Sequence, residues 1–283
     1  MMLSRFSHSP LKGGFVASVL ALVGLAAAGA AQASPLPTLS IAVGKASATI
    51  TGPLESGGVN VVTTNTGVKE ANVILFLLKP GVSVAQAETF IKEKRVKGDP
   101  NNTEGLGAIV FDAEAARGKT REAQTELQPG TYLLLVGSGE GEAALRGNFV
   151  VTAAKSPVKL TAPEATVRTI DFAFRGAKKL HDGELVRFEN EGFLVHMDIA
   201  APVKNMKAAE QLIKDLKAGK EKAAQKLIIG QPAGFAGPLS RGAYQQETIT
   251  AKPGVYVQVC FMQTQDGRDH ALLGMERIIK IVK

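Results

Sequence analysis

The sequence predicts an all-β protein made of two tandem Greek-key β-sandwiches, each with a helical insertion. Short runs rich in β-branched residues alternate in the manner of strands and are separated by Gly, Pro and Asn turns. The two halves of the chain also align with each other, at an offset of 125 and then 124 residues. A repeat of this kind indicates two copies of one domain.

Two pairs of segments carry the alignment. The first pair is GGVNVVTTNTG at residues 57–67 and DGELVRFENEG at residues 182–192, and both end in Asn-x-Gly. The second pair is RGKTREAQTELQPGTYLLLV at residues 117–136 and RGAYQQETITAKPGVYVQVC at residues 241–260. Arg-Gly, Pro-Gly and Tyr fall in register in the second pair, so the turns that deliver the chain into this strand are repeated.

The N-terminal segment has the layout of a secretory signal peptide. Arg5 and Lys12 give a positive start, residues 15–28 are apolar, and Ala31-Gln32-Ala33 is a small-x-small cleavage signal. We therefore expect residues 1–33 to be removed and the mature chain to begin at Ser34. No later stretch is apolar enough to span a membrane, so we expect no stable membrane span after cleavage and a periplasmic or secreted protein.

The rest of the chain divides into two predicted domains, residues 34–154 and 155–283, each with one helical segment. The first helical segment is expected near residues 84–93 and the second, longer one at about residues 206–227. In the second, apolar residues recur at helical spacing: Met206, Ala209, Leu212, Ile213 and Leu216. We expect this apolar face to pack against the sandwich.

The composition argues against a nucleic-acid partner and excludes an internal disulfide. The formal net charge is +7, but the lysines are dispersed and tryptophan is absent. Without aromatic residues interleaved among basic ones, we expect no nucleic-acid partner. The chain has 1 cysteine, Cys260, so an internal disulfide is impossible and the thiol is either buried, paired with another chain, or bound to something.

Four residues of the second copy form a metal-ligand set. His196 stands at the start of a strand, Cys260 ends the Pro-Gly-x-Tyr strand, and His270 and Met275 follow it. Two imidazoles, a thiolate and a weak thioether are the ligands of a blue-copper site. Thiolate and thioether favour Cu(I), while imidazole accepts both oxidation states, so such a set suits one-electron transfer.

The first copy serves as an internal control for this ligand set. At the aligned positions it carries Ala71, Val136, Ala143 and Asn148, the last two with a shorter loop assumed. Strand formation alone therefore does not require His, Cys or Met at these places. We expect the first domain to bind no copper.

The segments NEGFLVHMD, PGVYVQVC and HALLGM resemble the cupredoxins, the plastocyanin-like and azurin-like proteins. The resemblance implies a Greek-key sandwich that holds one type 1 copper ion at one end. His196 would come from the loop entering a middle strand, and Cys260, His270 and Met275 from the loop that joins the last two strands. The sequence departs from small electron carriers in the longer segment between Cys260 and His270, which must fold back; Asp266-Gly267 can make that turn.

Each of these residues also has a simpler interpretation. Cys260 alone would be read as a small buried hydrophobe, His196 as a core histidine, and Met275 as core filler. Met197 and Met262 are expected in the core, because they point to the strand face opposite the ligands. His181 precedes a turn and is expected on the surface, whereas Asp269 could orient His270.

The sequence predicts a protein without enzymatic activity. Copper oxidases and nitrite reductases need a second copper centre with further histidines, and only His181, His196 and His270 follow the signal peptide. We expect an exported cupredoxin-like protein that binds one copper and transfers single electrons with a redox partner protein. Two alternatives remain open: sequestration or delivery of Cu(I) by the same residues, or a metal-free cupredoxin-like binding module.

Overall fold

The computed structural model describes residues 35–93, 99–137 and 143–283. The predicted signal peptide, residues 1–33, lies outside them. In the described part of the chain, no helix combines the length and the apolar character that a membrane crossing requires.

The first half of the chain forms a two-layered β-sandwich, called here the N-terminal sandwich. One layer has the strand order β2-β1-β3-β6 and the other β5-β4-β7-β8. Between the layers lies an apolar core that includes Ile41, Val61, Val73 and Leu134. The elements are β1 (Thr38–Val43), β2 (Ala48–Thr51), β3 (Gly57–Asn65), β4 (Glu70–Leu78), α1 (Val84–Lys92), η2 (Pro100–Thr103), β5 (Gly107–Ala116), β6 (Lys119–Leu127), β7 (Gly130–Gly137) and β8 (Ala144–Val151).

The second half repeats this plan as the C-terminal sandwich. Its layers have the orders β10-β9-β12-β15 and β11-β17-β16-β13-β14. The elements are β9 (Ala165–Ile170), β10 (Ala173–Gly176), β11 (Lys179–His181), β12 (Leu185–Asn190), β13 (His196–Val203), α2 (Met206–Lys217), α3 (Glu221–Gln225), β14 (Ala233–Leu239), β15 (Tyr244–Thr248), β16 (Gly254–Val259), η3 (His270–Leu273) and β17 (Glu276–Val282).

Corresponding strands pair in the same way in both sandwiches. The first strand of each, β1 or β9, is antiparallel to the second and parallel to β3 or β12. In the other layer, β4 and β13 each lie between two antiparallel neighbours. The predicted all-β fold of two tandem sandwiches, each with a helical insertion, is therefore confirmed.

The repeated Pro-Gly-x-Tyr segments have a common structural reason. The Tyr132 hydroxyl donates to the carbonyl oxygen of Gln128 at 2.9 Å, and the Tyr256 hydroxyl donates to that of Lys252 at 2.7 Å. In each sandwich the tyrosine thus ties the strand to the turn that precedes it. This explains why Tyr and Pro-Gly keep register between the copies.

The second helical insertion differs from the single helix expected at residues 206–227. It forms two helices, α2 and α3, and Gly219 between them has a φ of 66°. A left-handed glycine just after the cap residue Ala218 is a common way to end a helix. The expected packing is confirmed for the middle and end of the face, because Leu212 and Leu216 belong to the same apolar cluster as Val257 of β16. Met206, at the start of the face, is instead 41% exposed.

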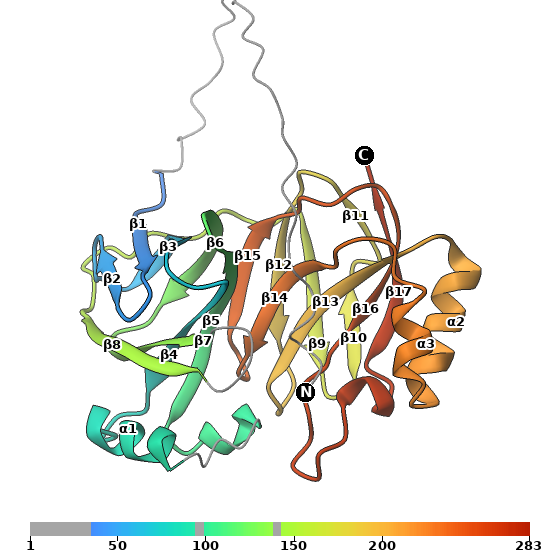
Figure 1. The fold of residues 1–283 in the computed structure, drawn as a ribbon. Helices are drawn as coiled ribbons and strands as arrows, with labels where there is room; N and C mark the ends of the chain where they lie inside the picture. Colours follow the sequence, from blue (N-terminus) through green and yellow to red (C-terminus); the bar gives the residue numbers. More distant parts are fainter. Residues whose placement is uncertain (1–34, 94–98, 138–142) are drawn as a thin grey trace, which may run out of the picture.

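The two sandwiches are joined through equivalent strands. The edge strands β6 and β15 pair antiparallel and merge the two half-sheets into an 8-stranded sheet, with β5 packed against β14 beside them (Figure 1). Side chains reinforce the join: Arg121 forms an ion pair with Glu247, and Ser240 Oγ accepts a hydrogen bond from the Ile109 amide at 2.9 Å. The backbone pairing is short, at Gln246 and Gln124, so the join covers part of two edges that would otherwise expose unpaired backbone groups.

A buried carboxyl group lies at this join. Asp112 of β5 is 1% exposed, and its backbone N–H donates to Gln245 Oε1 of β15 at 3.1 Å. Burial raises the pKa of Asp112 well above its ordinary value of 3.8, and the nearby Glu114 charge raises it further. The folded protein therefore holds this proton at a pH where the unfolded chain has lost it.

Asp112→Asn is expected to stabilise the protein in a manner that depends on pH. With the native pKa raised, the stability contributed by Asp112 is complete below the ordinary pKa and is lost as pH rises through the native pKa. Between the ordinary pKa and the raised native pKa, the difference in free energy of unfolding between Asp112→Asn and the wild type should therefore grow by about 1.4 kcal/mol per pH unit. Urea unfolding of both proteins from pH 4 upward measures it; a difference that does not change with pH would contradict the prediction.

Candidate metal centre

His196 is positioned by the short segment between β12 and β13. Asn190, the last residue of β12, is buried and donates to the carbonyl oxygens of Leu194 at 2.8 Å and Leu239 at 2.7 Å. Its Oδ1 accepts from the Gly192 amide at 2.9 Å. These bonds satisfy the polar groups of the turn, so His196 enters the middle strand β13 at a defined place.

The N-terminal sandwich has the same hydrogen-bonded asparagine turn, but no histidine follows it. Asn65, at the end of β3, donates to Val68 O at 3.0 Å and Ala115 O at 2.8 Å. Its Oδ1 accepts from the amides of Gly67 and Val68, both at 3.1 Å. The repeated Asn-x-Gly is therefore a structural turn in both copies. Only in the C-terminal copy is it followed by a histidine, His196, at the position where the first copy has Ala71.

The remaining amides of the His196 segment are held from outside it. Asp171, in the turn after β9, accepts from Phe193 N at 2.9 Å and from Leu194 N at 3.1 Å. Asn101 accepts from Val195 N at 2.7 Å. Asn101 belongs to η2 of the N-terminal sandwich, so the first copy reaches the ligand segment of the second.

The long segment between Cys260 and His270 folds back as a small hairpin. Gln263 bridges to Asp269, and the Gly267 amide donates to Thr264 O at 2.8 Å, with Gly267 at a φ of 79°. The Asp266-Gly267 turn is thus where the sequence predicts it. His270 is brought back beside the strand end, where its amide donates to Met262 O at 2.8 Å.

The hairpin and strand ends gather all four predicted ligand residues in the interior. Cys260, His270 and Met275 are each 0% exposed and His196 is 1% exposed. Met275 is tied to its neighbours through the backbone: its amide donates to His270 O at 3.0 Å and its carbonyl accepts from Cys260 N at 3.2 Å. The left-handed Gly274, φ 104°, provides the turn that returns Met275 to the core.

Three donor atoms converge on one point. The Nδ1 atoms of His196 and His270 are 3.1 Å apart, and Cys260 Sγ lies 3.9 Å and 3.5 Å from them. In the part of the chain that the structure describes, this is the one group of three His, Cys, Asp or Glu side chains whose ligand atoms lie close enough to share an ion. Metal–nitrogen bonds of about 2.0 Å and a metal–sulfur bond of about 2.3 Å place donors at such separations.

Burial keeps these groups uncharged in the metal-free protein. Desolvation raises the pKa of Cys260 to about 12, against the backbone N–H groups of Met197 and Met262, which lower it. Desolvation lowers the pKa of His270 to about 4, and repulsion from a charged His196 adds to this. The pKa of His196 is also lowered by burial, although Asp171 opposes the shift. Neutral imidazoles keep a lone pair for a metal, and the thiol would lose its proton on binding.

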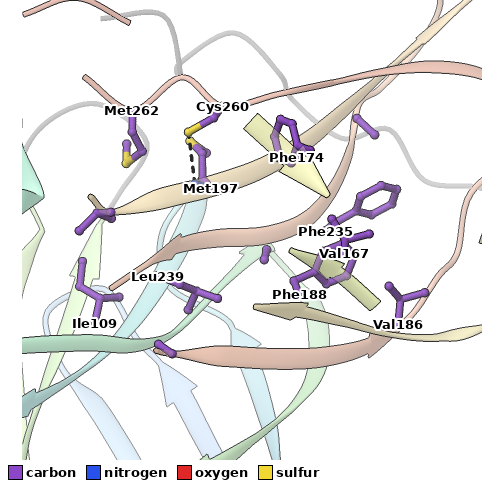
Figure 2. Packing of buried hydrophobic residues seen from close by; sticks show 14 of the residues in the cluster. Ile109, Val167, Phe174, Val186, Phe188, Met197, Phe235, Leu239, Cys260 and Met262 are labelled. Carbon is purple, nitrogen blue, oxygen red and sulfur yellow. Dashed lines mark hydrogen bonds between the residues drawn. The ribbon is translucent and has the colours of Figure 1, made fainter. Parts of the chain in front are cut away.

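A continuous apolar cluster surrounds the centre. Met197 and Met262 are buried in it as predicted, and Figure 2 shows them beside Cys260, whose Sγ accepts from the Met197 amide at 3.4 Å. The same cluster includes Ile109 of the N-terminal sandwich, drawn next to Leu239. A water-poor shell of this kind controls the redox potential of a bound metal.

Other residues singled out from the sequence lie where their simpler interpretation puts them. His181 is exposed at the end of β11, with its Nδ1 3.7 Å from Glu184. Asp269 does not orient His270; its Oδ1 accepts from Gln263 Nε2 at 3.0 Å. Ala71 and Val136, which replace His196 and Cys260 in the first copy, are buried core residues.

Asp171 and Asn101 were not predicted from the sequence. Asp171 Oδ1 lies 3.1 Å from His196 Nε2 and is the nearest acidic contact of the site. Comparing the two copies could have identified Asp171. The second copy has an acidic residue in this turn, whereas the equivalent turn of the first copy, residues 44–47, has none. Comparing the copies could not identify Asn101, because it bonds to Val195 of the other copy.

Comparison with known proteins gives structural similarity only. No family model matches the sequence, and no curated protein matches it. Auracyanin from Roseiflexus castenholzii is similar at 19% identity over 42% of this chain and 95% of its own, with a TM-score of 0.26. Auracyanin A, a blue copper protein from Chloroflexus aurantiacus, is 17% identical over 41% and 96%, with a TM-score of 0.24. The copper-containing nitrite reductase of Thermus scotoductus is 14% identical over 87% and 67%, with a TM-score of 0.25.

These identities and TM-scores are low; the strand order by itself shows two tandem β-sandwiches of the same plan. This arrangement agrees with the two tandem sandwiches that the sequence's resemblance to the cupredoxins implies. Of the two copies, only the C-terminal one brings His, Cys and His side chains together in the described residues, and Met275 follows shortly after His270 in the chain.

Proposed function

We propose that the C-terminal sandwich binds one copper ion through His196, Cys260 and His270, with the Met275 thioether as a weak axial ligand, and that the protein transfers single electrons. The observation that carries the proposal is the convergence of two Nδ1 atoms and one Sγ atom, 3.1–3.9 Å apart, in a fully buried place. A copper ion bound there would supply a one-electron couple.

The chain's own residues suit this role in two ways. The fully buried Cys260 and His270 keep water away from the centre, and the hydrogen-bonded hairpin and Asn190 turn hold the donors before any ion arrives. A preformed donor set limits the rearrangement that accompanies a change of oxidation state. The redox partner is proposed to be another protein, and the setting to be the periplasm or the extracellular space.

We propose no enzymatic activity for this centre. Of the three histidines that follow the predicted signal peptide, two belong to the centre and His181 lies on the surface. A second copper centre of the oxidase type would need several more. The N-terminal sandwich is proposed to have a supporting role.

Copper titration tests the proposal. Adding Cu(II) to the metal-free protein is expected to give one bound ion and an intense visible band from the copper–thiolate bond, and Cys260→Ser is expected to abolish this band. His181→Gln is the control and should keep it, because His181 is exposed and outside the donor set. A band that persists in Cys260→Ser, or a wild-type protein that retains no copper, would refute the ligand assignment.

Voltammetry of the copper-loaded protein separates electron transfer from Cu(I) handling. A reversible couple together with the visible band supports electron transfer. Tight Cu(I) binding without the band, and without a reversible couple, would instead indicate sequestration or delivery by the same residues.

A further inference from the structure

Asp171 lies outside the donor set but contacts it directly. Its Oδ1 is 3.1 Å from Nε2 of His196, whose side chain is fully buried, while the Asp171 side chain is 31% exposed. The structure assigns Asp171 a positioning role: it holds His196 as the Nε2–H tautomer, which leaves Nδ1 free for the metal ion. This inference rests on the proposed function.

The tautomer follows from the inventory of donors and acceptors. An ionised carboxylate only accepts hydrogen bonds, and a neutral imidazole carries one N–H. With Nε2–H donating to Asp171, the lone pair of His196 is on Nδ1. That atom faces Nδ1 of His270 at 3.1 Å and Sγ of Cys260 at 3.9 Å, so the tautomer that Asp171 selects is the one that the donor set needs.

The carboxylate itself is fixed by the ligand segment. The same Oδ1 accepts from the amides of Phe193 at 2.9 Å and Leu194 at 3.1 Å. A Cβ added at Gly192 would lie 2.6 Å from Asp171 Oδ1 and 2.8 Å from His196 Nε2, so the close approach depends on glycine there. Asp171 thus joins the β9–β10 turn, the ligand segment and the imidazole.

The other imidazole has no equivalent contact. Nε2 of His270 is buried and has no hydrogen-bond partner among the described residues, and the ring instead meets the edge of Phe172 at a centroid distance of 5.2 Å. Asp269, next to His270 in the chain, bonds to Gln263. The orienting carboxylate therefore acts on one ligand only, and its negative charge should favour Cu(II) over Cu(I).

The test compares Asp171→Asn and Asp171→Ala in the full chain. Asp269→Asn is the comparison variant: it removes a second nearby charge and keeps an oxygen to accept from Gln263, but it leaves the Asp171–His196 contact intact. In Asp171→Asn, the asparagine keeps an oxygen for the Phe193 and Leu194 amides, so the tautomer and the visible band should remain while the reduction potential rises. In Asp171→Ala, Cu(II) affinity should fall about ten- to a hundred-fold. Asp269→Asn should lower Cu(II) affinity less than Asp171→Ala does and shift the potential less than Asp171→Asn does.

The tautomer is read without copper, from the ¹⁵N chemical shifts of the His196 ring in the metal-free protein. We expect the Nε2–H form in the wild type and in Asp171→Asn, and its loss in Asp171→Ala. An unchanged tautomer and an unchanged Cu(II) affinity in Asp171→Ala would overturn the inference. A wild-type protein that takes up no copper would refute the proposed function, while the ring shifts would still decide whether Asp171 sets the tautomer.

Discussion

Replacing Gly67 with alanine is expected to lower the free energy of unfolding by about 3 kcal/mol. Gly67 closes the Asn-x-Gly turn of the N-terminal sandwich, and an added Cβ would overlap the backbone of Gly44 and Lys45. Backbone atoms cannot rotate away as a flexible side chain can, so the two turns would have to separate. Thermal or urea unfolding of the metal-free protein measures the loss.

Gly105→Ala is the matched control for this substitution. Gly105 is in the same sandwich, and a Cβ there would meet nothing within 4 Å. Its stability should stay within about 0.5 kcal/mol of the wild type. Equal stabilities of the Gly67 and Gly105 variants would contradict the close contact between residues 44–45 and the Asn-x-Gly turn.

Asn190→Ala is expected to reduce stability and copper binding together. The substitution removes the partners of Leu194 O, Leu239 O and the Gly192 amide, and buried groups left unsatisfied cost about 1–3 kcal/mol each. We expect the free energy of unfolding to fall by about 3 kcal/mol. The His196 segment would loosen as well, so Cu(II) affinity should fall about tenfold or more.

The N-terminal copy offers an internal control for this prediction. Asn65→Ala removes the same kind of bonds from the equivalent turn, where Ala71 stands in place of the histidine. It should lower stability by a similar amount and leave Cu(II) affinity unchanged. An Asn65 variant that weakens copper binding as much as the Asn190 variant would show that the loss reflects general destabilisation, not the ligand segment.

The repeated β architecture could be predicted from the sequence because its signals are local. Asn-x-Gly and Pro-Gly-x-Tyr are short turns with bonds inside the turn: Asn65 to Val68, Asn190 to Leu194, Tyr132 to Gln128 and Tyr256 to Lys252. Each asparagine also donates to a carbonyl far away in the chain, Ala115 or Leu239, which the local pattern does not encode. The four candidate ligands could be singled out because His, Cys and Met are rare in this chain and none of them stands at the aligned positions of the first copy. The helix break lies at Gly219, whereas the apolar stripe alone predicts one continuous helix over residues 206–227.

The supporting contacts of the centre could not be predicted in the same way. Asn101 meets Val195 across 94 residues of chain, and Asp171 meets His196 through a turn whose direction depends on tertiary packing. No periodicity or spacing encodes such contacts. The pairing of β6 with β15 is similar, because an edge strand has the same local pattern whether its neighbour is solvent, another molecule or the other half of the same chain.

The pairing of β6 with β15 gives one polypeptide the arrangement that two separate subunits would reach only around a twofold axis. Because the two sandwiches are covalently connected, dilution would not separate them, as it would separate a weak dimer. The connection also sets a stoichiometry: each pair of sandwiches has a single metal-ligand set in the described residues. Under the proposed function, one molecule would carry one electron at a time, because the described residues hold one donor set.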